Sequence, residues 1–491
     1  MTLSIQLGII VGYLLFALVI GLVAYRMTER TAEDFYLASR TVGTVVLLFT
    51  TFATLLSAFT FFAGPNMAYA WGPEWILVMG LMDGIIFAIL WYVIGYKQWL
   101  LGQRYDYVTL GEMLGDRFAS RELRGLVAGV SLIWLFPYVM LQQVGAGTAL
   151  EALTEGAVSY AAGAGLITLF MILYVVVAGF RGIAWTDTLQ GAFMLVTTWI
   201  AFIWVLVAVG GLETATGTLQ NSPATSEFLA LGSANYTPQW MLSTAITIGF
   251  GVAMFPQVNQ RFFVAGSKRV IKRSFALWPI LCVLLFVPSF LLGVWAQGLG
   301  LEMGESGNIL PVILSEYTAV WFAALVIAGA MAAMMSSSDS MLLSGSSYFT
   351  RDLYRPFVEA DLSERREDLI ARVGVVCFAV ATFFASLYNP ATLFELGDAA
   401  FGGFAQLALP VIVALYWRGT TRTGLIAGIV GSQVFYLSSL FVPVIPGAYA
   451  GWTAGVVGML LGLALTVTVS WATTSVVEER RSRYFEGLSG D

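Results

Sequence analysis

An oxygen-rich cluster interrupts one of the most apolar parts of the sequence. The stretch AAMMSSSDSMLL (332–343) has Ser-Ser-Ser-Asp-Ser at its centre. On a helix, Ala333, Ser336 and Ser337 share one face because they are spaced i, i+3 and i+4. Their oxygens are hard, neutral ligands, suited to an alkali cation and poorly suited to transition metals. The structural alternative is that these hydroxyls only bond a carbonyl one turn back or hold helices together.

Two aspartates need a partner. An Asp at the centre of a membrane helix costs roughly 2.5–3.5 kcal/mol on insertion scales, so Asp339 is a functional hypothesis. Asp187 follows Arg181 by six residues, or about 9 Å along a helix, which puts both acids in the same half of the membrane. No Lys or Arg is expected within the helices to neutralise them. We therefore predict a second cation site, or a step on the ion's exit path, formed by Asp187, Ser336, Asp339 and Ser340; the alternative is a protonated or water-solvated Asp339.

Composition assigns the chain to the membrane. Of 491 residues, 58% are hydrophobic and only 11% are charged, against about 25% charged in soluble domains. The alternation typical of a transmembrane β-barrel is absent. Cys282 and Cys377 lie in apolar runs and predict neither a disulfide framework nor a metal site. The chain contains no histidine, and it has no H-E-x-x-H or G-x-S-x-G motif, so we expect no enzyme.

Apolar runs of about 20 residues or more predict an all-α membrane protein with thirteen spanning helices. The first run is too long for a signal-peptide core and is expected to be retained. The predicted helices are 5–26, 41–70, 75–97, 124–150, 158–179, 185–209, 240–263, 275–297, 319–348, 368–388, 396–417, 422–442 and 450–473.

The basic residues predict the orientation. All 24 Lys and Arg fall in alternate connections, which the positive-inside rule places in the cytoplasm. The N-terminus is then outside and the C-terminus inside, in the cell (inner) membrane. An odd number of helices is required, because an even number would put the basic tail on the other side.

Gly-Pro features predict two interrupted helices. Gly64 and Pro65 lie in the second predicted helix, and Gly251 and Pro256 lie in the seventh. A proline removes a backbone donor, and irregular backbone at membrane depth is tolerated only where it lines a cavity or packs in protein. A kink in a structural helix is the alternative for either one alone.

The two interrupted helices are five apart and run in opposite directions, which predicts an inverted 5+5 repeat with a solute site near the midplane. The predicted organisation is a single transporter domain over 1–491. It comprises a peripheral helix (5–26), a first five-helix repeat (41–209), a second inverted repeat (240–417), two peripheral helices (422–473) and a cytoplasmic tail (474–491).

Four segments in register resemble the sodium:solute symporter family. They are EDFYLASRTVGT (33–44), GFRGIAWTDTLQGAFML (179–195), AAMMSSSDSMLLSGSSYFTRDLY (332–354) and AFGGFAQLALPVIVALYWRGTTRTGLIAGIVG (400–431). The likeness is nearest to the pantothenate, monocarboxylate and proline permease branches. It implies the thirteen-helix version of the leucine-transporter fold. Asp339 departs from the family's commonest form, which has a neutral polar residue there.

The resemblance implies Na⁺-coupled import of a small organic solute by alternating access. Carried over by position, the Na⁺ ligands are backbone carbonyls of Ala53, Leu56 and Ala333 and hydroxyls of Ser336 and Ser337. Na⁺ binding is expected to stabilise the outward-facing arrangement. The expected partners are Na⁺, the solute and the lipid bilayer; no nucleic acid is expected, and oligomerisation is not required.

The solute is predicted to be a small carboxylate or an amino-acid-like molecule. With every basic residue assigned to a loop, half-helix N-termini, hydroxyls or amides would have to hold a carboxylate. An amine could meet Asp83, which could equally be a solvated acid in the outer vestibule. The candidate solute residues are Ser57, Thr60, Asp83, Gln142, Gln143, Phe255 and Gln257, and the candidate gate aromatics are Tyr69, Trp71 and Phe255.

Other functions on the same fold remain open at this point. A proton-coupled carrier or a uniporter is one alternative, because Asp187 and Asp339 could move protons. A transporter-derived solute sensor is another, although such chains carry an appended output domain and only about 18 mostly polar residues follow the last predicted helix.

Overall fold

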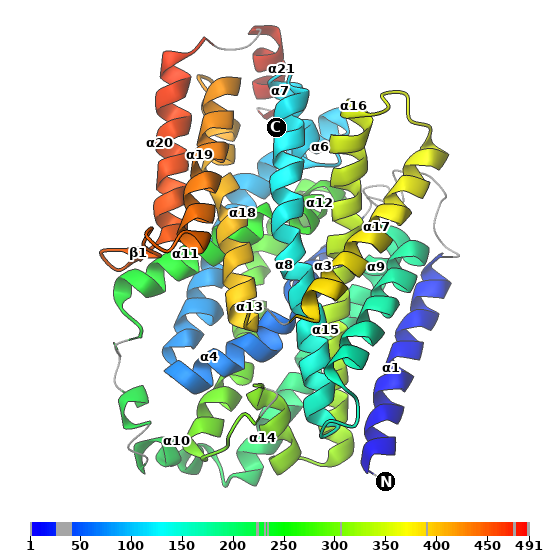
Figure 1. Cartoon of the computed structure of the whole chain (residues 1–491), viewed down its shortest axis with the longest axis vertical. Helices are drawn as coiled ribbons and strands as arrows, with labels where there is room; N and C mark the ends of the chain where they lie inside the picture. Colours follow the sequence, from blue (N-terminus) through cyan, green and yellow to red (C-terminus); the bar gives the residue numbers. More distant parts are fainter. Residues whose placement is uncertain are drawn as a thin grey trace.

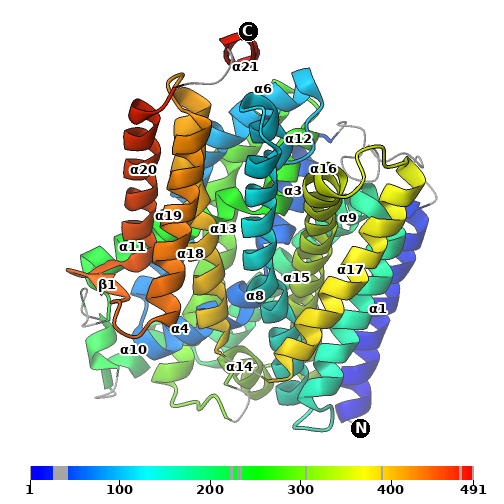
Figure 2. The same cartoon turned by 45° about the horizontal axis from the view of Figure 1, so that its top comes forward.

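The structure, a computed structural model, is a bundle of long helices that run in alternate directions (Figures 1 and 2). It describes residues 2–25, 42–221, 225–229, 232, 235–304, 307–388, 391–474 and 478–488. The predicted segment 33–44 therefore lies largely outside the described residues, as do Arg26, Arg30 and Arg40. The first helix begins at one face of the bundle and the last helix lies at the opposite face, as an odd number of crossings requires.

The helices that make up the bundle correspond closely to the predicted apolar runs. They are α1 (Thr2–Tyr25), α3 (Thr44–Leu55), α5 (Gly84–Leu90), α6 (Tyr96–Tyr105), α8 (Arg121–Leu153), α9 (Tyr160–Ala208), α11 (Pro238–Met254), α12 (Pro256–Val264), α13 (Lys268–Gly298), α15 (Val320–Ser347), α17 (Glu364–Ser386), α18 (Leu393–Tyr416), α19 (Arg422–Phe441) and α20 (Ala454–Ala472). Within the described residues, ten helices are long and apolar enough to cross a membrane, or twelve if each of two bent pairs is one span.

The long helix α9 covers two predicted helices, 158–179 and 185–209. Its first limb is the shorter apolar helix Tyr160–Val176, and its second limb is the span Gly182–Ala208. The Tyr174 hydroxyl lies 2.5 Å from Thr186 Oγ1, yet twelve residues of straight helix would separate these positions by about 18 Å. The chain must therefore change direction sharply between Tyr174 and Thr186.

The interruption of the second predicted helix is real, but it lies upstream of the predicted position. The chain bends by 65° between α3 and the segment Phe59–Trp71, so the break is at 56–58 and not at Gly64–Pro65. Pro65 instead follows a π-helical turn, η2 (Phe59–Ala63), at the start of α4 (Gly64–Trp71). A π-turn of this kind satisfies the backbone groups that a proline would otherwise leave unpaired.

Side chains from other helices take over the hydrogen bonds at this break. The backbone amide of Ala58 donates to Gln142 Oε1 at 2.9 Å, and Ser337 Oγ donates to the carbonyls of Thr54 and Leu56 at 2.8 and 2.6 Å. Because these partners belong to α8 and α15, the break is held by tertiary contacts and not by a local glycine or proline.

The interruption predicted at Pro256 in the seventh helix is confirmed. Helix α11 ends at Met254, α12 begins at Pro256, and the two are bent by 58°. Pro256 is at the first position of α12, where its missing amide costs nothing because the first turn has no intrahelical acceptor.

The span after α4 contains two π-helical segments. They are η3 (Ile76–Asp83) and η4 (Trp91–Gly95), on either side of α5. Asp83 is the last residue of η3. The extra residue that a π-turn accommodates therefore determines which way the Asp83 side chain points.

Short elements that have no long apolar run lie at the two faces of the bundle. Helix α7 (Leu110–Arg117), η6 (Tyr348–Tyr354), α16 (Arg355–Phe357) and α21 (Glu478–Leu488) lie at one face with α6 (Figure 1). Helix α10 (Leu212–Asn221), η5 (Ser226–Leu229) and α14 (Ile309–Tyr317) lie toward the other, and a two-stranded hairpin, β1 (Ala448–Tyr449) and β2 (Trp452–Thr453), precedes α20.

The segment expected to be a short polar tail contains α21, which packs on the bundle. Its Tyr484 is buried against the guanidinium of Arg117 on α7, 4.6 Å from the ring centroid. Burial raises the pKa of the Tyr484 hydroxyl to about 12, although Arg117 opposes this. Arg480 also pairs with Asp116 at 3.4 Å, so basic residues of the tail and of α7 share one face.

Candidate ion and solute site

The predicted Na⁺ ligands meet where α3 is broken. The end of α3 leaves carbonyls without intrahelical partners, and Ala53, Leu56, Ser336 and Ser337 are all at least 98% buried. Ser337 Oγ lies 2.6 Å from the Leu56 carbonyl oxygen, the shortest contact across the break. The structure thus brings the serine face of α15 against the opened backbone of α3.

The second predicted serine ligand faces a carboxylate. Ser336 Oγ donates to Asp187 Oδ1 at 2.6 Å, while Asp187 Oδ2 accepts from Thr50 and Thr54 at 2.6 and 3.2 Å. Ser340 Oγ lies 2.9 Å from Thr54 Oγ1. Hydroxyls of α3 and α15 therefore surround a carboxylate of α9, directly beside the break.

The expectation that no basic residue lies within the helices is wrong. Arg261, on α12, is completely buried, and one of its terminal nitrogens lies 2.8 Å from Asp187 Oδ2. The same nitrogen donates to Thr50 and Ser340 at 2.9 and 2.8 Å. A buried ion pair of this geometry supplies the counter-charge that Asp187 needs. One polar cluster therefore joins α3, α9, α12 and α15.

Asp339 stands apart from this ion pair. It is 2% exposed, and its Oδ1 has no hydrogen-bond partner among the described residues. Asp187 on α9 and Asp339 on α15 therefore have different partners, although these two helices pack against each other. The structure places Ser336 and Ser340 with Asp187, and it leaves Asp339 open to a further ligand.

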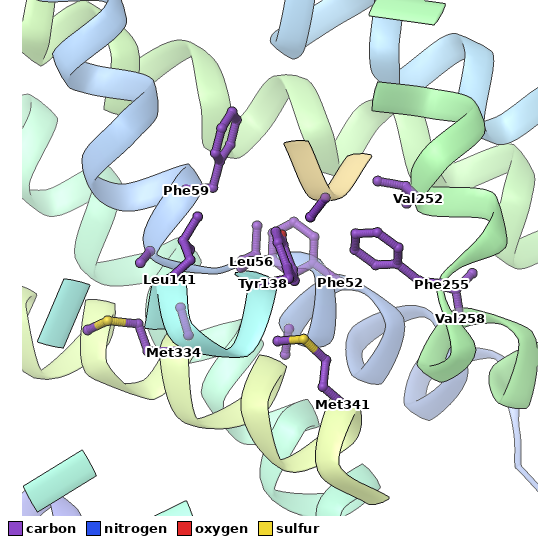
Figure 3. Close-up of a cluster of buried hydrophobic side chains, with 14 of the residues drawn as sticks. Phe52, Leu56, Phe59, Tyr138, Leu141, Val252, Phe255, Val258, Met334 and Met341 are labelled. Atoms are coloured by element: carbon purple, nitrogen blue, oxygen red, sulfur yellow. The ribbon is translucent and has the colours of Figure 1, made fainter. Parts of the chain in front are cut away.

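A narrow cavity lies on the other side of the break, between α3, η3, α8, α11, α13 and α18. Leu56, Thr60, Asp83 and Tyr138 line it together with aromatic rings. Its free volume is about 20 Å³, which is room for about one water molecule. Figure 3 shows Leu56 and Tyr138 close together near the end of α3, with the ring of Phe59 pointing away from them. A solute can occupy this place only when the surrounding helices move apart.

The remaining candidate solute residues lie in different places. Ser57 Oγ lies 3.1 Å from the hydroxyl of Tyr138, which lines the cavity. Gln142 is engaged by the backbone of the break, and Gln143 bonds Thr168 and the Ala379 carbonyl on the side facing α9 and α17.

The residues at the seventh-helix break are also buried. The ring of Phe255 stacks on Phe401 with centroids 5.7 Å apart. Both side-chain polar atoms of Gln257 lack hydrogen-bond partners among the described residues. Of the candidate gate aromatics, Tyr69 donates to the Leu301 carbonyl at 2.8 Å, and the ring of Trp71 lies 5.3 Å from that of Trp240.

Sequence reasoning missed Arg261, Tyr138, Thr50 and Thr54. One signal was available for Arg261: four apolar residues, Phe-Phe-Val-Ala, follow it directly, which is unusual for the start of a loop. Nothing in the sequence marks Tyr138, because its role depends on facing Ser57 from another helix.

This geometry can be compared with known proteins. The model of the sodium:solute symporter family matches residues 35–431. The chain belongs to the sodium:solute symporter family. Among curated relatives, the sodium/pantothenate symporter of Escherichia coli (strain K12) is 28% identical over 93% of this chain and 96% of that protein. The sodium/proline symporter of Haemophilus influenzae is 26% identical over 88% and 87%.

Solved structures show the same fold. A Na⁺-coupled sialic acid symporter in a substrate-bound outward-open state has a TM-score of 0.78 at 20% identity, over 96% of this chain and 99% of that one. A nucleobase-cation-symport-1 family transporter has a TM-score of 0.60 at 17% identity, over 94% and 99%. These are leucine-transporter-fold transporters. The chain is therefore a multi-pass membrane transporter and not an enzyme, and its family couples transport to Na⁺.

Proposed function

We propose that this symporter imports a small organic solute, a carboxylate or an amino-acid-like molecule, together with Na⁺ by alternating access. The observation that carries the proposal is the contact of Ser337 Oγ with the Leu56 carbonyl at the broken end of α3. Hydroxyl and carbonyl oxygens of two separate elements converge there, in a fully buried place next to the central cavity. An ion bound between these elements would hold α3 and α15 together, and its release would let them separate.

The proposed Na⁺ ligands are the carbonyls of Ala53, Leu56 and Ala333 and the hydroxyls of Ser336 and Ser337. All five are neutral oxygens, so the site supplies no full charge of its own. The carboxylate of Asp187, which accepts a hydrogen bond from Ser336, is already paired with Arg261. Weak binding of this kind suits an ion that must leave on the cytoplasmic side.

Asp187, Ser336, Asp339 and Ser340 are proposed to line the exit path of the ion. A second resident cation beside Asp187 would have to displace the Arg261 guanidinium, which contacts Asp187, Thr50 and Ser340 at 2.8–2.9 Å. Asp339 Oδ1, without a partner among the described residues, offers a transient ligand further along. The exit path is therefore favoured over a second permanent site.

We propose that the chain crosses the inner membrane thirteen times. Residues 41–209 and 240–417 form the inverted repeats, and 5–26 and 422–473 form peripheral helices. The first limb of α9, Tyr160–Val176, supplies the crossing beyond the twelve long spans. Opposite faces for α1's start and α21 support the odd number. The face with α6, α7 and α21 carries Arg104, Arg117 and Arg480, so it is assigned to the cytoplasm.

Removing the Ser337 hydroxyl tests the Na⁺ site without knowledge of the solute. In Ser337→Ala and Ser336→Ala, the Na⁺ concentration that gives half-maximal thermal stabilisation should rise tenfold or more, or about 1.4 kcal/mol. The measurement is a titration of the purified protein with NaCl, with KCl keeping the ionic strength constant. Ser338→Ala is the matched control, because Ser338 Oγ only bonds the Met334 carbonyl one turn back. If all three variants responded to Na⁺ like the parent protein, this ligand assignment would be wrong.

Cysteine labelling tests the orientation. Cysteines replacing Gln239, before the bend of α11, and Ser267, next to the basic segment Lys268–Arg273, should lie on opposite sides of the membrane in a variant without Cys282 and Cys377. Both positions are exposed. In intact cells, an impermeant maleimide should label position 239, whereas position 267 should react only after permeabilisation. Labelling of position 267 in intact cells would contradict the assigned orientation.

A further inference from the structure

The central cavity contains a carboxylate that nothing in the described structure neutralises. Asp83 lines the cavity and is 7% exposed, and its Oδ1 has no hydrogen-bond partner among the described residues. The backbone of α11 lies against it, since a Cβ added at Gly249 would lie 3.3 Å from Asp83 Oδ1. The Asp83 carboxylate is therefore fixed at the wall of the cavity, but its Oδ1 accepts no hydrogen bond from the described residues there.

The surroundings of Asp83 are apolar and aromatic. Of the described residues that line the cavity, Asp83 is the one with a formal charge. The buried cation Arg261 is committed to Asp187 on the opposite side of the α3 break. Besides Tyr138, the rings around the cavity are those of Phe52, Phe59, Phe87, Trp278, Phe286 and Phe401.

An unpaired buried carboxylate is costly, and a cationic ligand removes that cost. Aromatic faces add a favourable interaction with the same ligand charge. A solute whose only charge is a carboxylate would instead bring a second negative charge into a closed apolar space beside Asp83. We propose that the transported solute carries a positively charged ammonium group, which pairs with Asp83 among these rings. This inference rests on the proposed symport function and selects solutes with an ammonium group, such as amino-acid-like molecules, over simple carboxylates.

A second buried carboxylate on the approach to the cavity has the same character. Glu74, in the turn after α4, is 2% exposed, and neither of its oxygens has a hydrogen-bond partner among the described residues. A Cβ added at Gly72 would lie 3.1 Å from Glu74 Oε2, so the side chain folds back on its own turn. The turn lies against η5, since the same Cβ at Gly72 would lie 3.4 Å from Phe228 Cγ.

An aromatic cluster begins at the residue after Glu74 and leads inward. Trp75, the next residue, lies 6.2 Å from Trp240 and 6.4 Å from Phe59 between ring centroids. Phe59 in turn contacts Phe401 of the cavity at 5.1 Å. A solute cation therefore meets an acid within an aromatic cluster at the outer turn and again in the cavity, which is the pattern expected of a path for ammonium groups.

Matched solutes test this in proteoliposomes that contain the full chain and an imposed Na⁺ gradient. The panel comprises leucine, its deaminated acid isocaproate and its decarboxylated amine isoamylamine; proline, cyclopentanecarboxylate and pyrrolidine; and choline with its neutral carbon isostere. The ammonium-bearing members of at least one set should be taken up, and their partners without ammonium should not. Asp83→Asn should raise the concentration for half-maximal uptake of that solute at least tenfold, whereas Asp83→Glu should retain the preference for ammonium.

Two controls separate loss of recognition from loss of fold. Na⁺-dependent thermal stabilisation should persist in Asp83→Asn, because Asp83 is not among the Na⁺ ligands. Glu213→Gln, on the exposed surface of α10, should leave uptake unchanged. Na⁺-driven uptake of isocaproate or cyclopentanecarboxylate in preference to the ammonium members would overturn the inference and leave symport intact. An unchanged half-maximal concentration in Asp83→Asn would also overturn it. Absence of Na⁺-driven uptake of every member would overturn the proposed function and this inference with it.

Discussion

Arg261→Met is expected to lower the free energy of unfolding by about 3–5 kcal/mol, because it leaves the completely buried carboxylate of Asp187 without its counter-charge. Methionine retains much of the apolar volume of the arginine stem, so the loss reports on the charge of the guanidinium and on its hydrogen bonds to Thr50 and Ser340. The measurement is unfolding of the purified protein in mixed micelles by titration with SDS. Na⁺ stabilisation should weaken as well, because Asp187 also accepts the Ser336 hydroxyl.

A double variant and a surface variant calibrate this result. Arg261→Met with Asp187→Leu removes both charges and should recover much of the lost stability. Arg366→Met breaks an exposed pair with Glu359, whose side chains are 59% and 28% exposed, and should cost at most about 1 kcal/mol. If Arg261→Met lowered the free energy of unfolding no more than Arg366→Met, Arg261 and Asp187 would not form a buried ion pair.

Gly251→Ala should destabilise the protein by about 1–3 kcal/mol and impair transport, because α11 and α18 touch backbone to backbone at this glycine. A Cβ added at Gly251 would lie 2.2 Å from the Phe401 carbonyl oxygen, which cannot move aside as a flexible side chain could. Helix propensity alone predicts the opposite sign, since alanine is favoured over glycine by about 1 kcal/mol in a helix interior. The measurement is the same SDS titration, together with Na⁺-driven uptake in proteoliposomes of a solute that the parent protein transports.

Gly80→Ala is the matched control for this substitution. A Cβ at Gly80 would make ordinary contacts of 3.5 and 3.6 Å with the side chains of Ile76 and Phe286. It should therefore be tolerated. Equal stability of the Gly251 and Gly80 variants would show that α11 and α18 are further apart than the structure places them.

The sequence predicts the spans well because the length of an apolar run and the thickness of a membrane are directly linked. Runs such as 124–150 and 396–417 correspond to α8 and α18 within a few residues. The short helices α7, α14 and α21 have no long apolar run, so composition does not reveal them.

The position of a break depends on distant partners, and this explains the error in the second helix. Gly64 and Pro65 are local signals for a break, yet the π-helical turn η2 before them lets the helix continue through these residues. The actual break at Leu56 is held by Gln142 and Ser337, which are 84 and 281 residues away from their backbone partners. At Pro256 the local signal and the tertiary structure agree, and there the prediction is confirmed.

The serine face of α15 could be predicted because its spacing is local, whereas the charge balance around it could not. Arg261 was counted with the loop because basic residues usually mark one. Its partner Asp187 lies 74 residues earlier on a different helix, and no pattern in either segment links them. Asp83 was recognised as a candidate for an amine, but its lack of a partner is visible only when α8, α11 and α13 are in place.

The two π-helical segments that flank α5 make the direction of Asp83 sensitive to deletions more than to substitutions. A π-turn is equivalent to one residue inserted into an α-helix, and each residue turns an α-helix by about 100°. Loss of a single codon in Ile76–Met82 or in Trp91–Gly95 would therefore rotate the stretch that carries Asp83 relative to the rest of its span on that side. Under the proposed pairing of Asp83 with an ammonium group, an in-frame deletion there would therefore change the solute preference in one step while Asp83 itself stays in the gene.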